Sequence, residues 1–184
     1  VTALDAGGFS GEKTLRGGRD KASLANVADI AGIARLDYEP IDKTIIGCSA
    51  YGGTAGNIIG REISALVPVG LFDIDARTQL GGFSGRGQLV VLLIGDTARL
   101  NEAFAAADAD ADAAPVAAQS YGGYLEVGYD ILSLFDAAAG QDLTVFGRVE
   151  HVDTQAGVVQ GFTPRSEFRD TTFAVGASYR PISI

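Results

Sequence analysis

The sequence is poor in the residues from which many kinds of site are built. It contains one cysteine, Cys48, and one histidine, His151, among 184 residues. One cysteine cannot form an internal disulfide framework or a cysteine-based zinc site, and one histidine excludes metal motifs that need two. No Walker or dinucleotide-binding glycine motif follows a strand and opens a helix, so we expect neither a bound metal nor a cofactor.

Positive charge is also scarce. The 14 lysines and arginines are outnumbered by 23 aspartates and glutamates, which gives a formal net charge of -9. A protein that binds nucleic acid needs a basic surface to neutralise phosphates, so no nucleic-acid partner is expected. Hydrophobic residues make up 47% of the chain, enough apolar area to exclude general disorder.

Long apolar runs are absent. The longest, at residues 89–94, is far shorter than the ~20 residues that a transmembrane helix needs. A transmembrane β-strand needs only ~9–11 residues and alternates its faces, so strands remain a way to cross a membrane. Twenty-five glycines against five prolines favour a protein of strands and turns. The chain starts at Val1 without a methionine or a signal peptide, so we interpret it as a processed chain or an internal fragment.

Alternation of polar and apolar residues is the main pattern. It predicts seven strands, at residues 33–39, 44–52, 71–77, 89–94, 121–130, 143–150 and 171–180, and the remnant of another at 1–4. Short and long links follow one another along the chain, as in transmembrane barrels whose long loops lie at one end. We predict an all-β fold over residues 1–184, an antiparallel up-and-down meander that is part of a transmembrane β-barrel. A soluble antiparallel sheet is the alternative that the pattern leaves open.

Parts of the chain outside the clear alternation carry further signals. In residues 96–107, Leu100, Phe104 and Ala107 recur at helical spacing, which predicts a short amphipathic helix. Residues 89–94 are apolar on both faces, so we expect a loop to cover the inner one. The segments 5–30 and 96–119 are the candidates for a loop that folds inward and narrows a pore.

The alternation assigns each strand residue to one of two faces. In a barrel, the polar face would line the lumen with Arg35, Asp37, Glu39, Asp73, Asp75, Arg77, Glu126, Asp130, Arg148, Glu150 and Arg180. The apolar face would meet lipid with Leu36, Tyr38, Phe72, Ile74, Tyr121, Leu125, Val127, Tyr129, Val145, Val149, Phe173, Val175 and Tyr179. Tyr121 and Tyr129 have the spacing of the two aromatic girdles of a membrane barrel. Acidic residues outnumber basic ones seven to four in the lumen set, which favours cations or neutral solutes.

Residues that could act in catalysis are poorly arranged. His151 lies beside Glu150, but the alternation directs the two side chains to opposite faces. Ser10 and Ser84, each within Gly-Gly-Phe-Ser-Gly, lack the second glycine of a nucleophile elbow. We predict no catalytic residue and no enzymatic activity.

Two remaining features carry weaker signals. Cys48 has no base nearby in the sequence that would activate a thiolate, so we interpret it as a small strand residue. Asp108, Asp110 and Asp112 could attract calcium, but they lack the spacing of an EF-hand. A solvated acidic loop is therefore the expectation for these three residues.

Five stretches of the chain, taken in order, resemble a known family. They are 34–40 (ARLDYEP), 47–53 (GCSAYGG), 121–130 (YGGYLEVGYD), 145–155 (VFGRVEHVDTQ) and 173–181 (FAVGASYRP). Together they resemble strand and turn segments of bacterial outer-membrane porins of the phosphate-selective porin superfamily. The resemblance implies a sixteen-stranded barrel in the outer membrane of a Gram-negative bacterium, usually a homotrimer. It identifies the chain as the C-terminal half of such a porin, truncated at both ends.

The resemblance also implies a function, namely passive diffusion of small hydrophilic solutes or ions through a bilayer. The phosphate-selective members owe their preference to arginine and lysine along the pore, whereas the predicted lumen set here is mainly acidic. The alternatives are a non-channel surface or adhesion barrel and a soluble β-sheet protein that binds a ligand.

Overall fold

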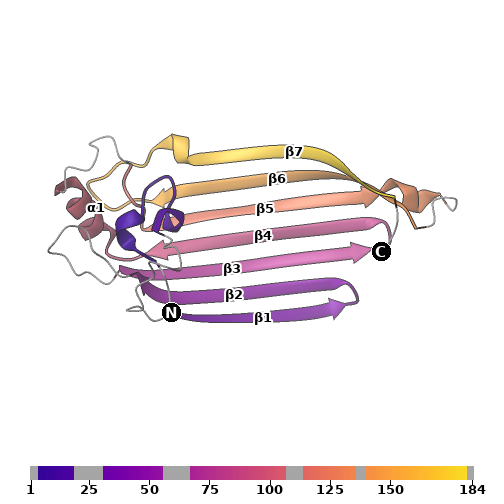
Figure 1. The fold of residues 1–184 in the computed structure, drawn as a ribbon, viewed down its shortest axis with the longest axis horizontal. Helices are drawn as coiled ribbons and strands as arrows, with labels where there is room; N and C mark the ends of the chain where they lie inside the picture. Colours follow the sequence, from indigo (N-terminus) through magenta and orange to yellow (C-terminus); the bar gives the residue numbers. More distant parts are fainter. Residues whose placement is uncertain (1–3, 19–30, 56–66, 107–113, 136–139, 182–184) are drawn as a thin grey trace.

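The computed structural model describes residues 4–18, 31–55, 67–106, 114–135 and 140–181. These form one antiparallel sheet in which each strand pairs with its neighbours in sequence (Figure 1). The strands are β1 (Ala31–Ile41), β2 (Thr44–Ala55), β3 (Val67–Leu80), β4 (Phe83–Ile94), β5 (Gln119–Asp130), β6 (Asp142–Gly157) and β7 (Arg169–Arg180). The prediction of an all-β meander of seven antiparallel strands is confirmed, and the sheet is open, with β1 and β7 at its edges. Of the predicted remnant at residues 1–4, only Leu4 lies within the described residues.

The strands run further than the alternation predicted. β4 begins at Phe83 instead of Leu89, because residues 81–82 alone join it to β3. Gly81 has a φ of 58°, in the left-handed region that glycine enters without a steric penalty and that tight hairpin turns require. The polar face therefore continues from β3 into the first half of β4, where Arg86 and Gln88 lie.

Short and long connections lie at opposite ends of the sheet. At the short-turn end, residues 42–43 join β1 to β2, residues 81–82 join β3 to β4, and the 3-10 helix η4 (Ile131–Leu134) follows β5. At the other end, here called the long-loop end, β2, β4 and β6 finish, and the described residues that follow β6 include η6 (Ser166–Phe168). The predicted helix is confirmed as α1 (Thr97–Ala106), with Leu100 buried. No helix in the described part of the chain has the length and apolar character to cross a membrane.

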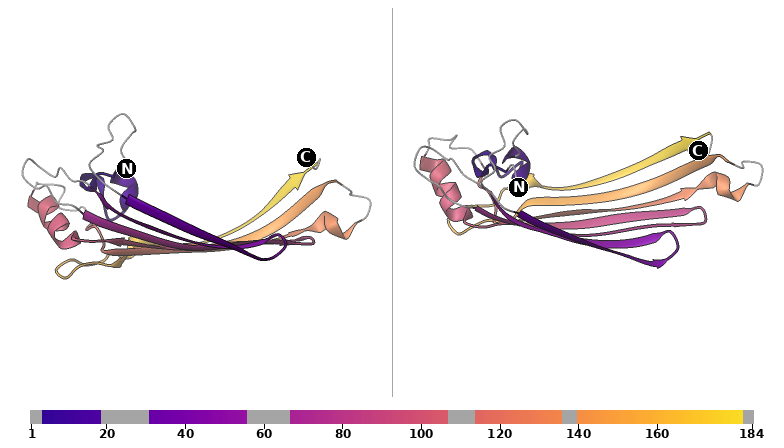
Figure 2. Two further views of the ribbon diagram at one scale, coloured as in Figure 1. Left: turned by 90° about the horizontal axis from the view of Figure 1, so that it is seen from below. Right: turned by 60° about the horizontal axis from the view of Figure 1, so that its bottom comes forward.

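The start of the described chain folds against the sheet. Residues 4–18, here called the cap, contain η1 (Ala6–Gly8) and η2 (Leu15–Gly18) and lie on the concave side at the long-loop end (Figure 2). Ala6 and Phe9 of the cap belong to a buried cluster with Ala55, Val67, Val69, Leu92, Ile94, Leu100 and Val116. The hydroxyl of Thr154 also donates a hydrogen bond to the carbonyl of Gly11, at 2.9 Å. The expectation that a loop covers the inner face of residues 89–94 is confirmed.

The two faces of the sheet differ in chemistry. Beyond the cap, the concave face carries charged side chains. The convex face carries large apolar side chains, with Leu36 68%, Leu89 62%, Phe173 79% and Val175 90% exposed. No described helix or strand covers this face (Figure 2). Nine of the ten buried hydrophobic residues in the described part of the chain thus belong to the cluster that includes the cap.

Candidate functional site: a charged band on the concave face

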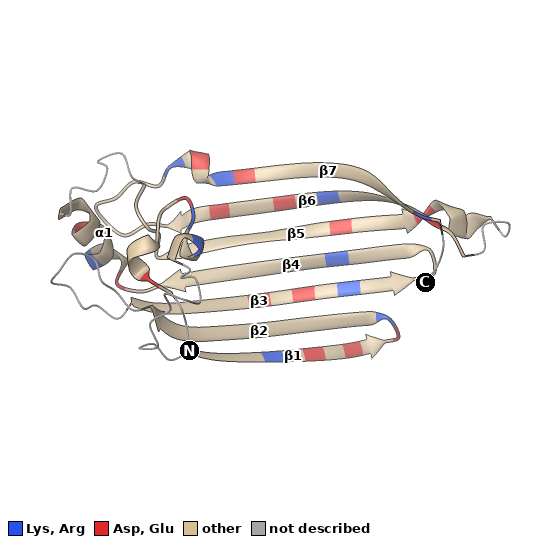
Figure 3. Ribbon diagram, viewed as in Figure 1, with Lys and Arg blue, Asp and Glu red and all other residues tan. Residues whose placement is uncertain are grey.

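The pairing registers place the predicted polar residues on the concave face. These are Arg35, Asp37, Asp73, Asp75, Arg77, Glu126, Asp130, Arg148, Glu150 and Arg180. Glu39 lies where the register between β1 and β2 shifts, between Tyr38 and Ile41. Charged residues of β1, β3, β4, β5 and β6 lie in a band across the middle of the sheet, which we call the charged band (Figure 3).

The registers place the predicted apolar residues on the convex face. These are Leu36, Tyr38, Phe72, Ile74, Tyr121, Leu125, Val127, Tyr129, Val145, Val149, Phe173, Val175 and Tyr179. The alternation of a flat strand is enough to separate the two sets, because successive side chains point to opposite faces.

One part of the charged band is centred on Arg35. Its guanidinium contacts Asp37 at 2.7 Å, Asp75 at 2.8 Å and Asp73 at 3.7 Å. The network is assembled over Gly47, because a Cβ at residue 47 would lie 2.8 Å from carboxylate oxygens of both Asp37 and Asp75, and closer still to Arg35. Three carboxylates share one guanidinium here, so this region is negative.

Asp73 is the most enclosed carboxylate of this group, with a side chain 7% exposed. It accepts a hydrogen bond from the hydroxyl of Ser49 at 2.7 Å and another from the amide of Gln88. Since a buried charge needs partners, these two donors on β2 and β4 fix the carboxylate between its neighbouring strands.

A second part of the charged band is centred on Glu126 in β5. Arg86 in β4 donates to it from Nε at 2.8 Å and from Nη2 at 3.0 Å, a bidentate pairing that fixes both side chains. Arg148 in β6 lies 3.7 Å from Glu126 and 2.8 Å from Glu150. The Arg148 guanidinium also stacks on the ring of Tyr124, 3.8 Å from its centroid.

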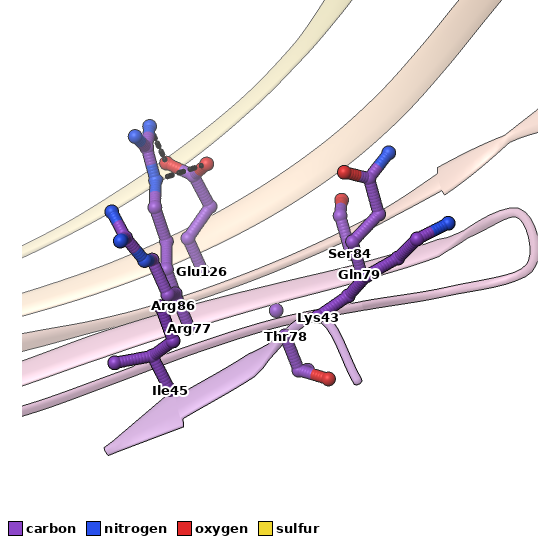
Figure 4. Close-up of a pocket in the computed structure, with 9 residues that line it drawn as sticks. Lys43, Ile45, Arg77, Thr78, Gln79, Ser84, Arg86 and Glu126 are labelled. Carbon is purple, nitrogen blue, oxygen red and sulfur yellow. Dashed lines mark hydrogen bonds and ion pairs between the residues drawn. The ribbon is translucent and has the colours of Figure 1, made fainter. Parts of the chain in front are cut away.

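A shallow depression of about 440 Å³ lies beside this pairing, toward the short-turn end. Its lining includes Lys43, Arg77, Arg86 and Glu126 (Figure 4). Arg77 stands directly opposite Arg86 in the register between β3 and β4. Within the described residues, neither Arg77 nor Lys43 takes part in an ion pair. The depression is therefore positive.

Two predicted lumen residues have local structural contacts. The carboxylate of Asp130 accepts hydrogen bonds from the backbone N–H of Leu132 at 3.1 Å and of Leu143 at 2.8 Å, and so ties η4 to β6. Arg180 forms an ion pair with Asp142 at the short-turn end of β6 and β7. Both lie away from the centre of the charged band.

The residues considered for catalysis are dispersed. His151 lies on the convex face with Nδ1 2.7 Å from the hydroxyl of Thr171 and its ring 5.8 Å from that of Tyr121, whereas Glu150 pairs with Arg148 on the concave face. The hydroxyl of Ser10 accepts a hydrogen bond from the N–H of Lys13. Cys48 is exposed, and the register places it on the convex face.

Residues 108, 110 and 112, considered for calcium, lie outside the described residues. In the part of the chain that is described, no group of three or more His, Cys, Asp or Glu could hold a metal ion.

A similar protein occurs in Aquifex aeolicus (strain VF5), under the description "Uncharacterized protein". It is 26% identical over 178 residues, which are 96% of this chain and 40% of that protein. The chain thus spans well under half the length of this relative. No family model matches the chain, and no solved structure matches it.

Sequence reasoning missed several residues of the site, among them Lys43, Arg86 and Gln88. Arg86 and Gln88 were taken as part of a link because the predicted strand began at Leu89. The signal that could have included them is the two-glycine turn at 81–82, which leaves β4 free to begin at Phe83 and to alternate from there.

Proposed function

We propose that this chain forms part of a transmembrane β-barrel of the outer membrane, which passes small hydrophilic solutes or ions by diffusion. The observation that carries the proposal is the convex face. Its large apolar side chains are exposed from β1 to β7, and Leu36, Leu89 and Phe173 are each more than half exposed. An apolar face of this extent points to contact with lipid, because proteins in water rarely expose large contiguous apolar patches.

The dimensions of the strands support the proposal. Each of the seven strands has at least 11 residues, and a tilted strand that crosses a bilayer needs ~9–11. Long connections gathered at one end and mainly short ones at the other are the arrangement of outer-membrane barrels.

The charged band supports a hydrated lumen on the concave side. Charges such as Arg86 and Arg148, with side chains 58% and 28% exposed, belong on a surface that meets water. The cap lies on the same side at the long-loop end, so in a closed barrel it would occupy part of the lumen and narrow the passage. The narrowing element would thus come from segment 5–30.

The resemblance to porins of the phosphate-selective superfamily extends the proposal to the whole protein. It would be a sixteen-stranded barrel, assembled as a homotrimer, of which the seven described strands make up about half. Diffusion through such a lumen requires no chemical step, so no enzymatic activity and no cofactor enter the proposal.

Planar bilayer recording on the full-length protein tests the proposal. Steady ohmic openings are expected. A protein that inserts but conducts no current would be a surface or adhesion barrel instead. A protein that stays monodisperse without detergent would be a soluble β-sheet protein, and the proposal would then be wrong.

A further inference from the structure

Opposite charges follow one another along the concave face of β3. Asp73, Asp75 and Arg77 occupy alternate positions and therefore share that face, running toward the short-turn end. On β4, Gln88 stands opposite Asp75 and Arg86 stands opposite Arg77. A negative region thus borders directly on a positive one, with successive same-face residues roughly 7 Å apart.

The positive region contains an unfavourable pairing. Like charges placed directly opposite on neighbouring strands destabilise a sheet, and Arg77 and Arg86 are placed in this way. Both side chains rise from the same side of the sheet (Figure 4). Glu126 compensates Arg86 through its bidentate pairing, whereas Arg77 and Lys43 have no carboxylate partner among the described residues. An anionic group placed in the depression would relieve this repulsion.

The negative region has the opposite imbalance. Among the residues that the structure describes, Arg35 is the one cation that contacts the carboxylates of Asp37, Asp73 and Asp75. Asp37 has a side chain 51% exposed, so it can be reached from the concave side, and Asp75 beside it is 24% exposed, with its Oδ2 buried. A cationic group beside them would meet two carboxylates that share a single guanidinium.

We propose that the two regions together form a binding site for a zwitterionic solute. Its ammonium group would lie near Asp75 and Asp37, and its carboxylate near Arg77 and Lys43. A solute with one charge would satisfy one region and leave the other uncompensated. The spacing along β3 favours ω-amino acids, whose charges are separated by several bonds. This inference rests on the proposed pore, because it assumes that the concave face is open to passing solutes.

Three probes of similar length separate the contributions of the positive and negative regions to binding: γ-aminobutyrate, butyrate and butylammonium. Their binding to the detergent-solubilised full-length protein is measured by titration calorimetry, which requires no conductance. We expect γ-aminobutyrate to bind at least about tenfold more tightly than either probe with one charge, since it alone makes charge-assisted contacts at both ends. Equal affinity for butyrate and γ-aminobutyrate would reduce the site to an anion site, and no binding would overturn the inference.

Two variants test which region binds which charged end of the solute. Arg77→Gln should remove the advantage of γ-aminobutyrate over butylammonium, and Asp75→Asn should remove its advantage over butyrate. Arg180→Gln is the control, because Arg180 lies on the same face at the far side of the sheet, paired with Asp142. An equal loss in all three variants would contradict the assignment.

Bilayer recording of the same samples keeps the two proposals apart. Binding of γ-aminobutyrate without ion conduction would contradict the proposed pore but not the proposed binding site. Open channels without selective binding would contradict the binding site but not the pore.

Discussion

Arg35 in β1 and Asp75 in β3 meet across β2, with Nη1 and Oδ2 2.8 Å apart, because the residue between them is Gly47. Any side chain at residue 47 would occupy the space in which the guanidinium and the two carboxylates converge. The contact therefore depends on a residue that takes no part in it.

Gly47→Val should displace this network. We expect the free energy of unfolding to fall slightly, because exposed ion pairs contribute little to stability. Urea titration in detergent measures the change. Gly52→Val in the same strand is the control, because a Cβ there meets nothing within 4 Å. In combination with Arg35→Gln, the effect of Gly47→Val should largely disappear, since the two changes remove the same contacts. Simple addition of the two effects would contradict the role given to Gly47.

Cys48 and Ser49 offer a test of which face meets lipid. A nitroxide attached to Cys48, on the convex face, should collide more often with oxygen than with a water-soluble nickel chelate once the protein is in vesicles. A label on Ser49→Cys in a Cys48→Ser background should show the reverse, because it projects from the concave face at the same depth. Electron paramagnetic resonance saturation measures both accessibilities. The same preference at both positions would argue against the membrane proposal.

Leu89 and Gln88 give a second neighbouring pair. Leu89→Arg would place a charge among lipid chains and should reduce the stability of the inserted protein by about 2–4 kcal/mol if the residue lies near the bilayer midplane. Gln88→Arg should be tolerated, because residue 88 faces Asp75 and already contacts Asp73. Folding into lipid vesicles over a urea series measures both. Equal stabilities for the two variants would refute the assignment of faces.

Phe9 is the aromatic anchor of the cap, with 4% of its surface exposed. Phe9→Ala would remove the ring from the cluster around Leu92 and Ile94, a loss of roughly 3–5 kcal/mol for a buried phenylalanine. We expect the cap to detach, the single-channel conductance to rise and residues 4–18 to become sensitive to protease. Lys13→Ala, at an exposed position of the cap, should leave both properties unchanged. Unchanged conductance with a cleaved cap would show that the cap does not narrow the passage.

The strands could be predicted because period-two alternation is local. It requires only that one face of the strand meet water and the other meet an apolar environment. Adjacent residues already show this difference, as Arg35 and Leu36 do in one strand and Glu126 and Val127 in another. The helix around Leu100 and Phe104 could be predicted for the same reason, with a different period.

Contacts between distant parts of the chain could not be predicted in this way. Phe9 joins Leu92 and Ile94 in one buried cluster, and Arg35 reaches Asp75 across β2, because of strand register and chain reversal, which no single segment specifies. The glycine at residue 47 did not predict the ion-pair network above it either, since a glycine in a strand is equally typical of a bulge or a close approach of backbone.

The edge strands β1 and β7 each leave one row of peptide groups without a pairing strand among the described residues. In hydrocarbon every such group would lack the hydrogen bond that water otherwise supplies, at several kcal/mol each. A pore made from this sheet could therefore not enter the bilayer one hairpin at a time. Its biogenesis would couple insertion to ring closure in one concerted step, and the slowest event would be the meeting of its outermost strands with their neighbours.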